Sequence, residues 1–198
     1  MKHFIKEWGL FILLMSAFIL SYIFVWVNVA VDGHSMDPTL ADGERLFVLK
    51  VAKIDRFDIV VADETDEDGK TKKIVKRVIG MPGDTITYEN DTLYVNGKQT
   101  DEPYLKEYQE LFAKDKLQST YTYNKLFQQL AQQSPAFTAD RSGSANFTVT
   151  VPEGQYYLLG DDRIVSKDSR EVGTFAKEAI VGEIKFRFWP FNKIGTVD

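Results

Sequence analysis

The chain has 198 residues, of which 44% are hydrophobic and 27% are charged, so it is long enough for one globular domain with a small appendage. It contains no cysteine, which excludes disulfide bonds, thiolate catalysis and zinc sites built on cysteine. The formal net charge of -5 argues against nucleic-acid binding, because that role needs a basic surface.

Residues 9–30 form an apolar run without a charged side chain. As a helix this run would extend roughly 33 Å at about 1.5 Å per residue, enough to cross a hydrocarbon core of about 30 Å. A cleaved signal peptide is the alternative, but its apolar region is usually only about 7 to 15 residues long. The candidate cleavage site, Asn28-Val29-Ala30, is also poor. We therefore predict a cytoplasmic tail at 1–8 and a transmembrane helix at 9–30.

The charges on the two sides of this run predict its orientation. Lys2 and Lys6 precede it, with one acidic residue, Glu7. Asp32 and Asp37 follow it, and the next Lys or Arg is Arg45. The positive-inside rule therefore places the N-terminus in the cytoplasm and residues 31–198 outside. We expect a single-pass protein of the cell membrane with an extracytoplasmic domain.

The rest of the chain is mostly typical of β-strands. Short apolar runs at 45–52, 58–63 and 73–80 are bounded by turn or charge signals, and VNGK at 95–98 indicates a hairpin. The strand pattern resumes at 147–161 and ends at 178–191. Between them, apolar residues at helical spacing predict two amphipathic helices. We expect an antiparallel β core at 31–100 and 147–198, with a partly helical cap inserted at 101–146.

A serine lies just beyond the predicted membrane helix, in the segment GHSMDPTL at 33–40. From this position Ser35 can attack a substrate that is also held at the membrane. On these residues alone, an ordinary turn serine is the simpler interpretation. A serine nucleophile also needs a base that accepts its proton.

Histidine, the usual base, is poorly placed in this chain. Of the two histidines, His3 lies on the other side of the predicted membrane, and His34 is the immediate neighbour of Ser35, so its side chain normally points elsewhere. These positions argue against a Ser/His/Asp triad and against a histidine metal site. The remaining candidate base is a lysine.

Lys76 is the lysine whose surroundings favour that role. Strand alternation places it on one face between Ile74 and Val78, with Arg77 on the other face. Burial among apolar side chains lowers the pKa of a lysine towards the range where it can act as a base. A strand lysine that extends its amine to solvent remains the alternative.

Four segments together resemble, in order and spacing, the sequence boxes of the bacterial type I signal peptidases, Ser/Lys endopeptidases that remove secretory signal peptides. The segments are SMDPTL at 35–40, RFDIVV at 56–61, KRVIGMPGD at 76–84 and GDDRIVSKDSR at 160–170. With the apolar run, they cover the chain apart from the cap. The chain looks most similar to the short Gram-positive form of the family.

The resemblance implies a coiled, mainly antiparallel β fold on the outer membrane surface, without cofactor or metal. Ser35 would attack the scissile carbonyl, and Lys76 would take its proton and return it to the leaving amine. Ser166 would hydrogen-bond Lys76 and hold it in place, as the third member of a triad does. Asp168 and Arg170 would form an ion pair beneath the site.

The chain departs from the family pattern at two positions. Some members carry a serine at the position of Gly33, whose hydroxyl adds to the oxyanion hole; here only the backbone groups of Gly33 and Ser35 can serve. Asp162 stands where Asn is more usual, which leaves the hydrogen bonding of its loop open.

The expected partners are signal peptides of secreted preproteins and the lipid bilayer. A substrate strand is expected to pair with an exposed backbone edge before Lys76, with Ile74 and Val75 lining shallow pockets for small side chains. Core packing is the alternative for both residues. Whether the cap contacts substrate or the secretion translocon stays open.

Two other functions are compatible with parts of the pattern. A membrane-tethered assembly factor with the peptidase fold, as among pilus-dedicated relatives, would not need Ser35, Lys76 and Ser166 together. A cytoplasmic-type Ser/Lys self-cleaving regulator would not need the apolar run at 9–30. The peptidase is therefore the favoured hypothesis.

Overall fold

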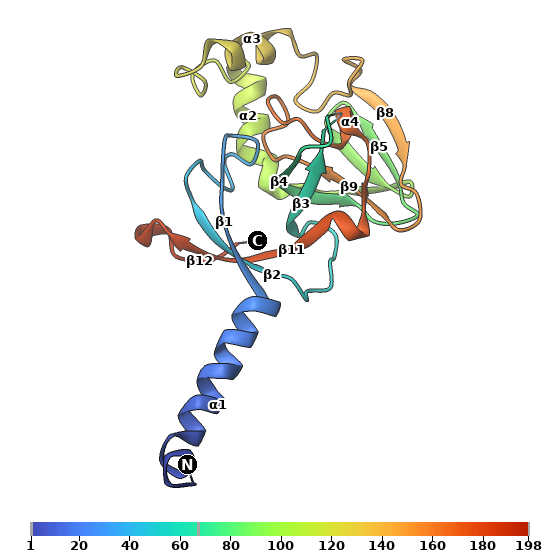
Figure 1. The fold of residues 1–198 in the computed structure, drawn as a ribbon. Helices are drawn as coiled ribbons and strands as arrows, with labels where there is room; N and C mark the ends of the chain where they lie inside the picture. The colour runs from blue at the N-terminus through green and yellow to red at the C-terminus, as the bar shows by residue number, and fades with distance from the viewer. Residues whose placement is uncertain (1, 67, 198) are drawn as a thin grey trace.

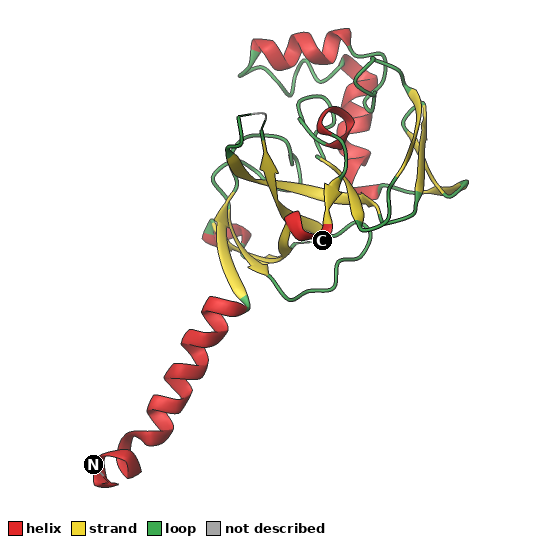
Figure 2. Cartoon of the chain, turned by 45° about the vertical axis from the view of Figure 1, so that its right-hand side comes forward, coloured by secondary structure: helices red, strands yellow, loops and turns green. Residues whose placement is uncertain are grey.

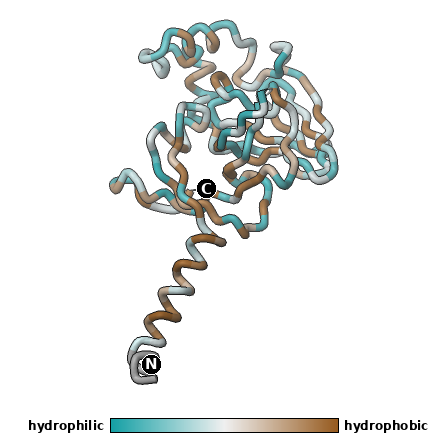
Figure 3. The backbone as a smooth tube through the Cα atoms, in the orientation of Figure 1, coloured by the Kyte–Doolittle hydropathy of each residue, from teal (hydrophilic) through white to brown (hydrophobic). Residues whose placement is uncertain are grey.

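The computed structural model describes residues 2–66 and 68–197 and consists of one long helix and a β-rich body (Figure 1). The helix, α1 (Lys2–Phe24), extends away from the body, and most of its length is coloured hydrophobic in Figure 3. Among the described residues, no helix is both long enough and apolar enough to cross a membrane.

The predicted helix at 9–30 is wrong at its C-terminal end. The helix ends at Phe24, and β1 (Trp26–Ala30) pairs antiparallel with β2 (Arg45–Leu49), from Trp26 opposite Leu49 to Ala30 opposite Arg45. Valines and a tryptophan at these positions favour a strand, and Val27 and Val29 pack against the buried core. Pairing with β2 therefore replaces the last part of the predicted helix.

The body contains a large, antiparallel β-sheet in which the order of the strands is β1-β2-β11-β3-β4-β9-β10, with β12 also paired to β11. The strands not yet defined are β3 (Ile59–Thr65), β4 (Thr71–Gly80), β9 (Gln155–Leu159), β10 (Phe175–Ala176), β11 (Ile180–Trp189) and β12 (Gly195–Thr196). The strands predicted at 45–52, 58–63 and 73–80 are confirmed as β2, β3 and β4. Segments from both ends of the chain thus meet in one sheet.

A second antiparallel sheet has the order β7-β6-β5-β8. Its strands are β5 (Thr85–Glu89), β6 (Thr92–Val95), β7 (Lys98–Thr100) and β8 (Asn146–Thr150). The predicted Asn-Gly hairpin is confirmed, because Asn96 and Gly97 join β6 to β7 with positive φ angles of 53° and 77°. A buried cluster that includes Ile79, Ile86, Tyr88 and Leu159 packs residues of this sheet against residues of β4 and β9.

The inserted segment forms the two predicted helices, α2 (Lys106–Asp115) and α3 (Lys125–Gln133), preceded by the 3-10 turn η1 (Pro103–Leu105). Figure 2 shows these helices on the side of the body away from α1. They share one buried cluster, made of Leu105, Tyr108, Phe112, Leu117, Tyr121, Ala131 and Phe137. Three short helical elements follow later in the chain: α4 (Ser169–Val172), η2 (Lys177–Ala179) and η3 (Phe191–Lys193).

Candidate active site

Ser35 lies in the loop that joins β1 to β2. The loop closes on itself, since the Val31 N–H donates to the Glu44 carbonyl at 2.8 Å and the Gly43 N–H donates back to the Val31 carbonyl at 2.9 Å. Met36 and Leu40 are fully buried in the core cluster below. These contacts fix the loop while Ser35 itself stays partly exposed.

Lys76 lies on β4 and reaches the serine directly. Its Nζ is 2.6 Å from the Ser35 Oγ, although the two residues are 41 positions apart in the sequence. Its side chain is only 4% exposed, and its backbone pairs with Val60 of β3. The structure therefore brings together the hydroxyl and the amine that the sequence analysis singled out.

Burial decides the charge state of this amine. Desolvation is the main cause that lowers the pKa of Lys76 from its usual value to about 8, partly offset by the negative charges of Asp168 and Glu64. At neutral pH an appreciable fraction of the amine is then unprotonated. An unprotonated amine beside a hydroxyl can accept its proton.

Glu64 is a buried carboxylate that the sequence analysis did not identify. Lys72 and Lys167 both bind it, at 3.3 and 3.2 Å. Its charge favours the protonated form of Lys76, whereas the charge of Lys72 disfavours it. The available sequence signal was that acidic residues 63–64 and basic residues 72–73 lie in or next to two successive predicted strands.

We expect Glu64→Gln to lower the pKa of Lys76 further. The substitution removes a negative charge near the amine and leaves the charges of Lys72 and Lys167 uncompensated, and both changes disfavour protonation. The rising limb of kcat/KM against pH should move to lower pH, with less than about twofold change in the plateau rate. Asp63→Asn is the control, because Asp63 pairs with exposed Lys73 at 2.8 Å; an unmoved limb in Glu64→Gln would contradict the electrostatic role.

Ser166 does not make the predicted hydrogen bond with Lys76. Its hydroxyl is buried and has no hydrogen-bond partner among the described residues. A Cβ atom added at Gly160 would collide with the Ser166 side chain and with the Ser35 carbonyl oxygen, so the serine packs against Gly160. The expected interaction is thus absent in this structure, although Ser166 lies next to the Ser35 backbone.

Asp168 and Arg170 form a buried ion pair behind the serine loop. Both guanidinium contacts are 2.8 Å long, from Nε to Oδ1 and from Nη2 to Oδ2. Asp168 also accepts the Gly160 N–H at 3.1 Å, and Arg170 donates to the Arg163 carbonyl at 2.8 Å. Despite burial, the charge and hydrogen bonds of Arg170 hold the pKa of Asp168 below its usual value. The pair fixes the loop that contains Gly160 and Ser166.

Only one of the two backbone groups predicted for the oxyanion hole is free. The Gly33 N–H donates to the Asp42 Oδ1 at 2.8 Å, so it is already engaged. Gly33 has a φ of 89°, a conformation that favours glycine. The Ser35 N–H has no acceptor within the described part of the chain. This leaves Ser35 as the available donor.

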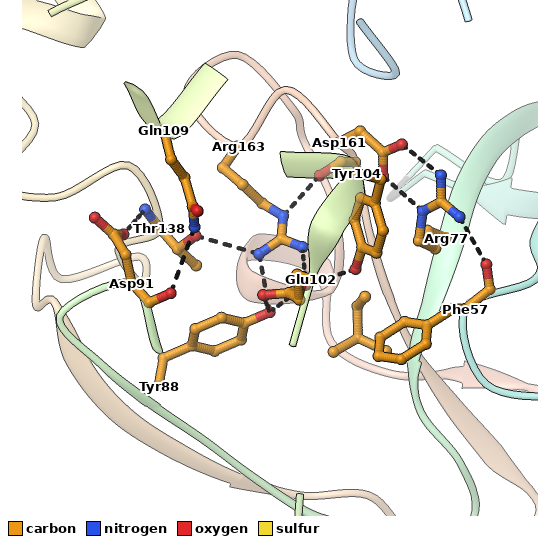
Figure 4. Close-up of polar contacts among 12 residues, drawn as sticks. Phe57, Arg77, Tyr88, Asp91, Glu102, Tyr104, Gln109, Thr138, Asp161 and Arg163 are labelled. Atoms are coloured by element: carbon orange, nitrogen blue, oxygen red, sulfur yellow. Dashed lines mark hydrogen bonds and ion pairs between the residues drawn. The ribbon is translucent and has the colours of Figure 1, made fainter. Parts of the chain in front are cut away.

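The arginine beside Lys76 ties its strand to the loop after β9. Arg77 points to the opposite face, as predicted, and its Nε and Nη2 bind Asp161 at 2.9 and 2.8 Å (Figure 4). Asp161 also accepts the Thr39 hydroxyl at 2.6 Å, and Arg77 donates to the Phe57 carbonyl at 2.8 Å. A charged residue in a buried strand requires a partner of opposite charge. The sequence alone does not identify Asp161, which lies 84 residues after Arg77, as that partner.

Ile74 and Val75 precede Lys76 on β4 and are partly buried. Ile74 packs against the cluster that contains Val60 and Val78, and Val75 packs against a separate cluster. On one side this part of β4 pairs with β3, whereas the pairing with β9 begins only at Arg77 opposite Leu159. Residues 71–76 therefore have one edge without a strand partner among the described residues.

His34 points away from the serine hydroxyl, towards the cap. Its Nδ1 lies 3.0 Å from the Asp37 Oδ2, and its ring lies 5.1 Å from the Tyr123 ring and 5.9 Å from the Phe127 ring, between centroids. Within the described residues, no cluster of His, Asp and Glu is arranged to hold a metal ion.

Comparisons with known proteins found a matching family and similar chains. The family model described as signal peptidase, peptidase S26, matches residues 4–189. A signal peptidase I of Streptococcus pneumoniae is 63% identical over 98% of both chains, and a signal peptidase IB of Staphylococcus aureus is 39% identical over 98% of this chain and 94% of its own. A crystal structure of a signal peptidase I from Enterococcus faecalis covers 67% of this chain and 97% of its own, at 30% identity and a TM-score of 0.46.

The matched range includes Ser35, Lys76 and the loop that contains Ser166 and Asp168. The first relative is similar along nearly its whole length, so the likeness is not confined to one segment. The chain belongs to the signal peptidase family, peptidase S26.

Proposed function

We propose that this protein is a serine endopeptidase that removes N-terminal signal peptides from secreted preproteins, with Ser35 as nucleophile and Lys76 as general base. The observation that carries the proposal is the 2.6 Å contact between the Lys76 amine and the Ser35 hydroxyl. A base near neutral pH also requires a lowered pKa, and that of Lys76 is about 8. The relatives named above are signal peptidases.

In the proposed reaction, the unprotonated Lys76 amine takes the proton of Ser35 while the serine oxygen bonds to the scissile carbonyl carbon. Lys76 then gives that proton to the leaving amine, and the carbon–nitrogen bond breaks to leave an ester on Ser35. Lys76 next takes a proton from water, which attacks the ester. Return of the proton to Ser35 completes the cycle.

The surrounding residues support this cycle in different ways. The Ser35 N–H, which has no acceptor in the described chain, is placed to stabilise the oxyanion. The hydroxyl of Ser166, which has no partner among the described residues, would accept a hydrogen bond from Lys76 once the amine is protonated. Asp168 and Arg170 hold the loop that carries Ser166.

The free edge of β4 before Lys76 is the proposed binding site for the substrate backbone. An extended peptide that pairs with this edge would place its scissile bond beside Ser35. Ile74 and Val75 are proposed to limit the size of the side chains before that bond, because both lie on this part of β4 and are partly buried.

The helix α1 is proposed to anchor the protein in the cell membrane, with the N-terminus in the cytoplasm and the body outside. Its large apolar side chains are exposed, including Leu10, Phe11, Phe18 and Phe24. Such a surface needs apolar surroundings. The charge asymmetry around residues 9–30 supports the orientation.

A preprotein cleavage assay tests the proposal directly. Purified full-length protein in lipid vesicles should release the mature product of a secreted preprotein, and replacing the small residue before the cleaved bond with a bulky one should block release. An uncleaved preprotein would contradict the peptidase function and favour an assembly role. The same vesicles test the anchor, because a protein held by α1 stays with them after alkaline extraction.

A further inference from the structure

Asp162 connects the two loops of the proposed site through its backbone. Its N–H donates to the Ser35 carbonyl at 3.1 Å, and its own carbonyl accepts the Ser166 N–H at 3.1 Å. The residue is 0% exposed. A movement of Asp162 would therefore move the backbone of the proposed nucleophile.

The side chain of Asp162 is held by the cap. The Tyr121 hydroxyl donates to its carboxylate and lies 2.6 Å from Oδ1 and 2.8 Å from Oδ2, and the Ile164 N–H lies 3.3 Å from Oδ1. No ion pair of Asp162 is found among the residues that the structure describes, and burial raises the pKa of this carboxyl to about 7. The tyrosine hydroxyl is thus its main side-chain partner.

Tyr121 is itself fixed within the cap. It lies in the turn between α2 and α3 and is 0% exposed. Its N–H donates to the Leu117 carbonyl at 2.9 Å, and its ring meets the Phe127 ring edge to face at 5.6 Å between centroids. The hydroxyl is therefore presented to Asp162 from a packed position.

Both ends of the cap are attached to the residue that follows Asp162. Arg163 contacts Glu102 at 2.5 Å and Thr138 at 3.2 Å, near the start and the end of the inserted segment (Figure 4). Its Nε also donates to the Gly160 carbonyl at 2.9 Å. Polar contacts thus join the cap to the 160–166 loop, and Tyr121 provides the one that binds the Asp162 side chain.

We propose that Tyr121 is a positioning residue for the reaction: its hydroxyl holds Asp162, and Asp162 in turn holds the backbone of Ser35. This gives the inserted cap a role in catalysis, and it rests on the proposed function of Ser35. A displacement of about 1 Å at a reacting group can lower a rate by about 100-fold, so a single buried hydrogen bond in this chain of contacts has a measurable effect.

Tyr121→Phe tests the proposal because it removes the hydroxyl and keeps the ring. We expect kcat for a preprotein to fall about tenfold with KM unchanged within about twofold, since the substrate-binding edge is untouched. Asp162→Asn should keep kcat within about threefold of wild type, because its amide oxygen still accepts from Tyr121 and its backbone bonds remain. Tyr123→Phe, an exposed tyrosine of the same cap, is the matched control and should match wild type.

A kcat for Tyr121→Phe equal to that of wild type would overturn the proposal, even if its melting temperature fell, because the hydroxyl would then serve stability alone. A tenfold loss in Asp162→Asn would also overturn it, since that variant keeps the contacts on which the proposal depends. The peptidase function is tested separately, by cleavage with the wild type and its loss in Ser35→Ala. A wild-type kcat in Tyr121→Phe would therefore overturn the positioning role without contradicting the peptidase function.

If Tyr121→Phe does not fold, the double variant Tyr121→Phe/Asp162→Asn is used in its place. In the double variant residue 162 is neutral, so the loss of the Tyr121 hydroxyl does not leave a buried negative charge without a partner. The double variant should have a kcat about tenfold below that of Asp162→Asn. Equal kcat values for the two would overturn the proposal.

Discussion

Ser35→Ala should lower kcat/KM for preprotein cleavage by about 10⁴-fold or more, because it removes the atom that forms the ester with the substrate. The residual rate would come from the oxyanion donor and from substrate positioning alone. The free energy of unfolding should change by only about 1 kcal/mol, since the lost contact is a single hydrogen bond to Lys76. Product release measured by gel, with melting temperature on the same samples, checks both expectations.

Ser119→Ala is the control for this substitution, because Ser119 lies in an exposed turn of the cap and is expected to leave kcat/KM unchanged. Cleavage by Ser35→Ala at more than about one-tenth of the wild-type rate would exclude Ser35 as the nucleophile. If Ser35→Ala neither cleaves nor folds, the site is tested with Lys76→Met instead, because that variant is expected to be more stable than the wild type.

Lys76→Met should also lower kcat/KM by about 10³-fold or more at pH 8, because the serine loses its proton acceptor while the site keeps its shape. Unlike most substitutions at active sites, it should stabilise the fold. Burial lowers the pKa of Lys76 from 10.5 to about 8, so at pH 7 the folded protein holds a buried ammonium at a cost of about 3 kcal/mol. Methionine removes that cost.

The size of this effect depends on pH. Below about pH 8 the amine is protonated in both the folded and the unfolded states, so the cost is fully present, and it disappears as the pH rises towards 10.5. The melting temperature of Lys76→Met should therefore exceed that of wild type at pH 7 and approach it at pH 10. Lys53→Met, at an exposed position outside the proposed site, should alter neither activity nor this pH dependence. Activity above about one-tenth of wild type in Lys76→Met would rule out the lysine base.

Local patterns predicted the strands well because short apolar runs bounded by turn or charged residues are a local signal. Lys76 and Arg77 are neighbours in the sequence, and the pleat alone places them on opposite faces. The end of the N-terminal helix could not be predicted in this way, because Trp26–Ala30 continues the uncharged run of the helix before it. Only the pairing of these residues with β2 makes them a strand.

The fine geometry of the site depended on contacts between distant residues. The Gly33 N–H is taken by Asp42, which lies in the same loop but nine residues later. The Ser166 side chain packs against Gly160, close to the Ser35 carbonyl of a distant segment. The link from Asp162 to Tyr121 spans 41 residues, so no spacing rule reveals it. The residues of the site and the pairs Ser35–Lys76 and Asp168–Arg170 could thus be predicted, but these longer-range contacts could not.

The central claim is that Lys76 accepts the proton of Ser35, and the dependence of kcat/KM on pH tests it most directly. Below about pH 8 the rate should rise about tenfold for each pH unit, because only the unprotonated amine is active, and it should level off above that pH. A profile that is flat from about pH 6 to 9, or that levels off near pH 6.5 as expected for an unperturbed histidine, would contradict the lysine base.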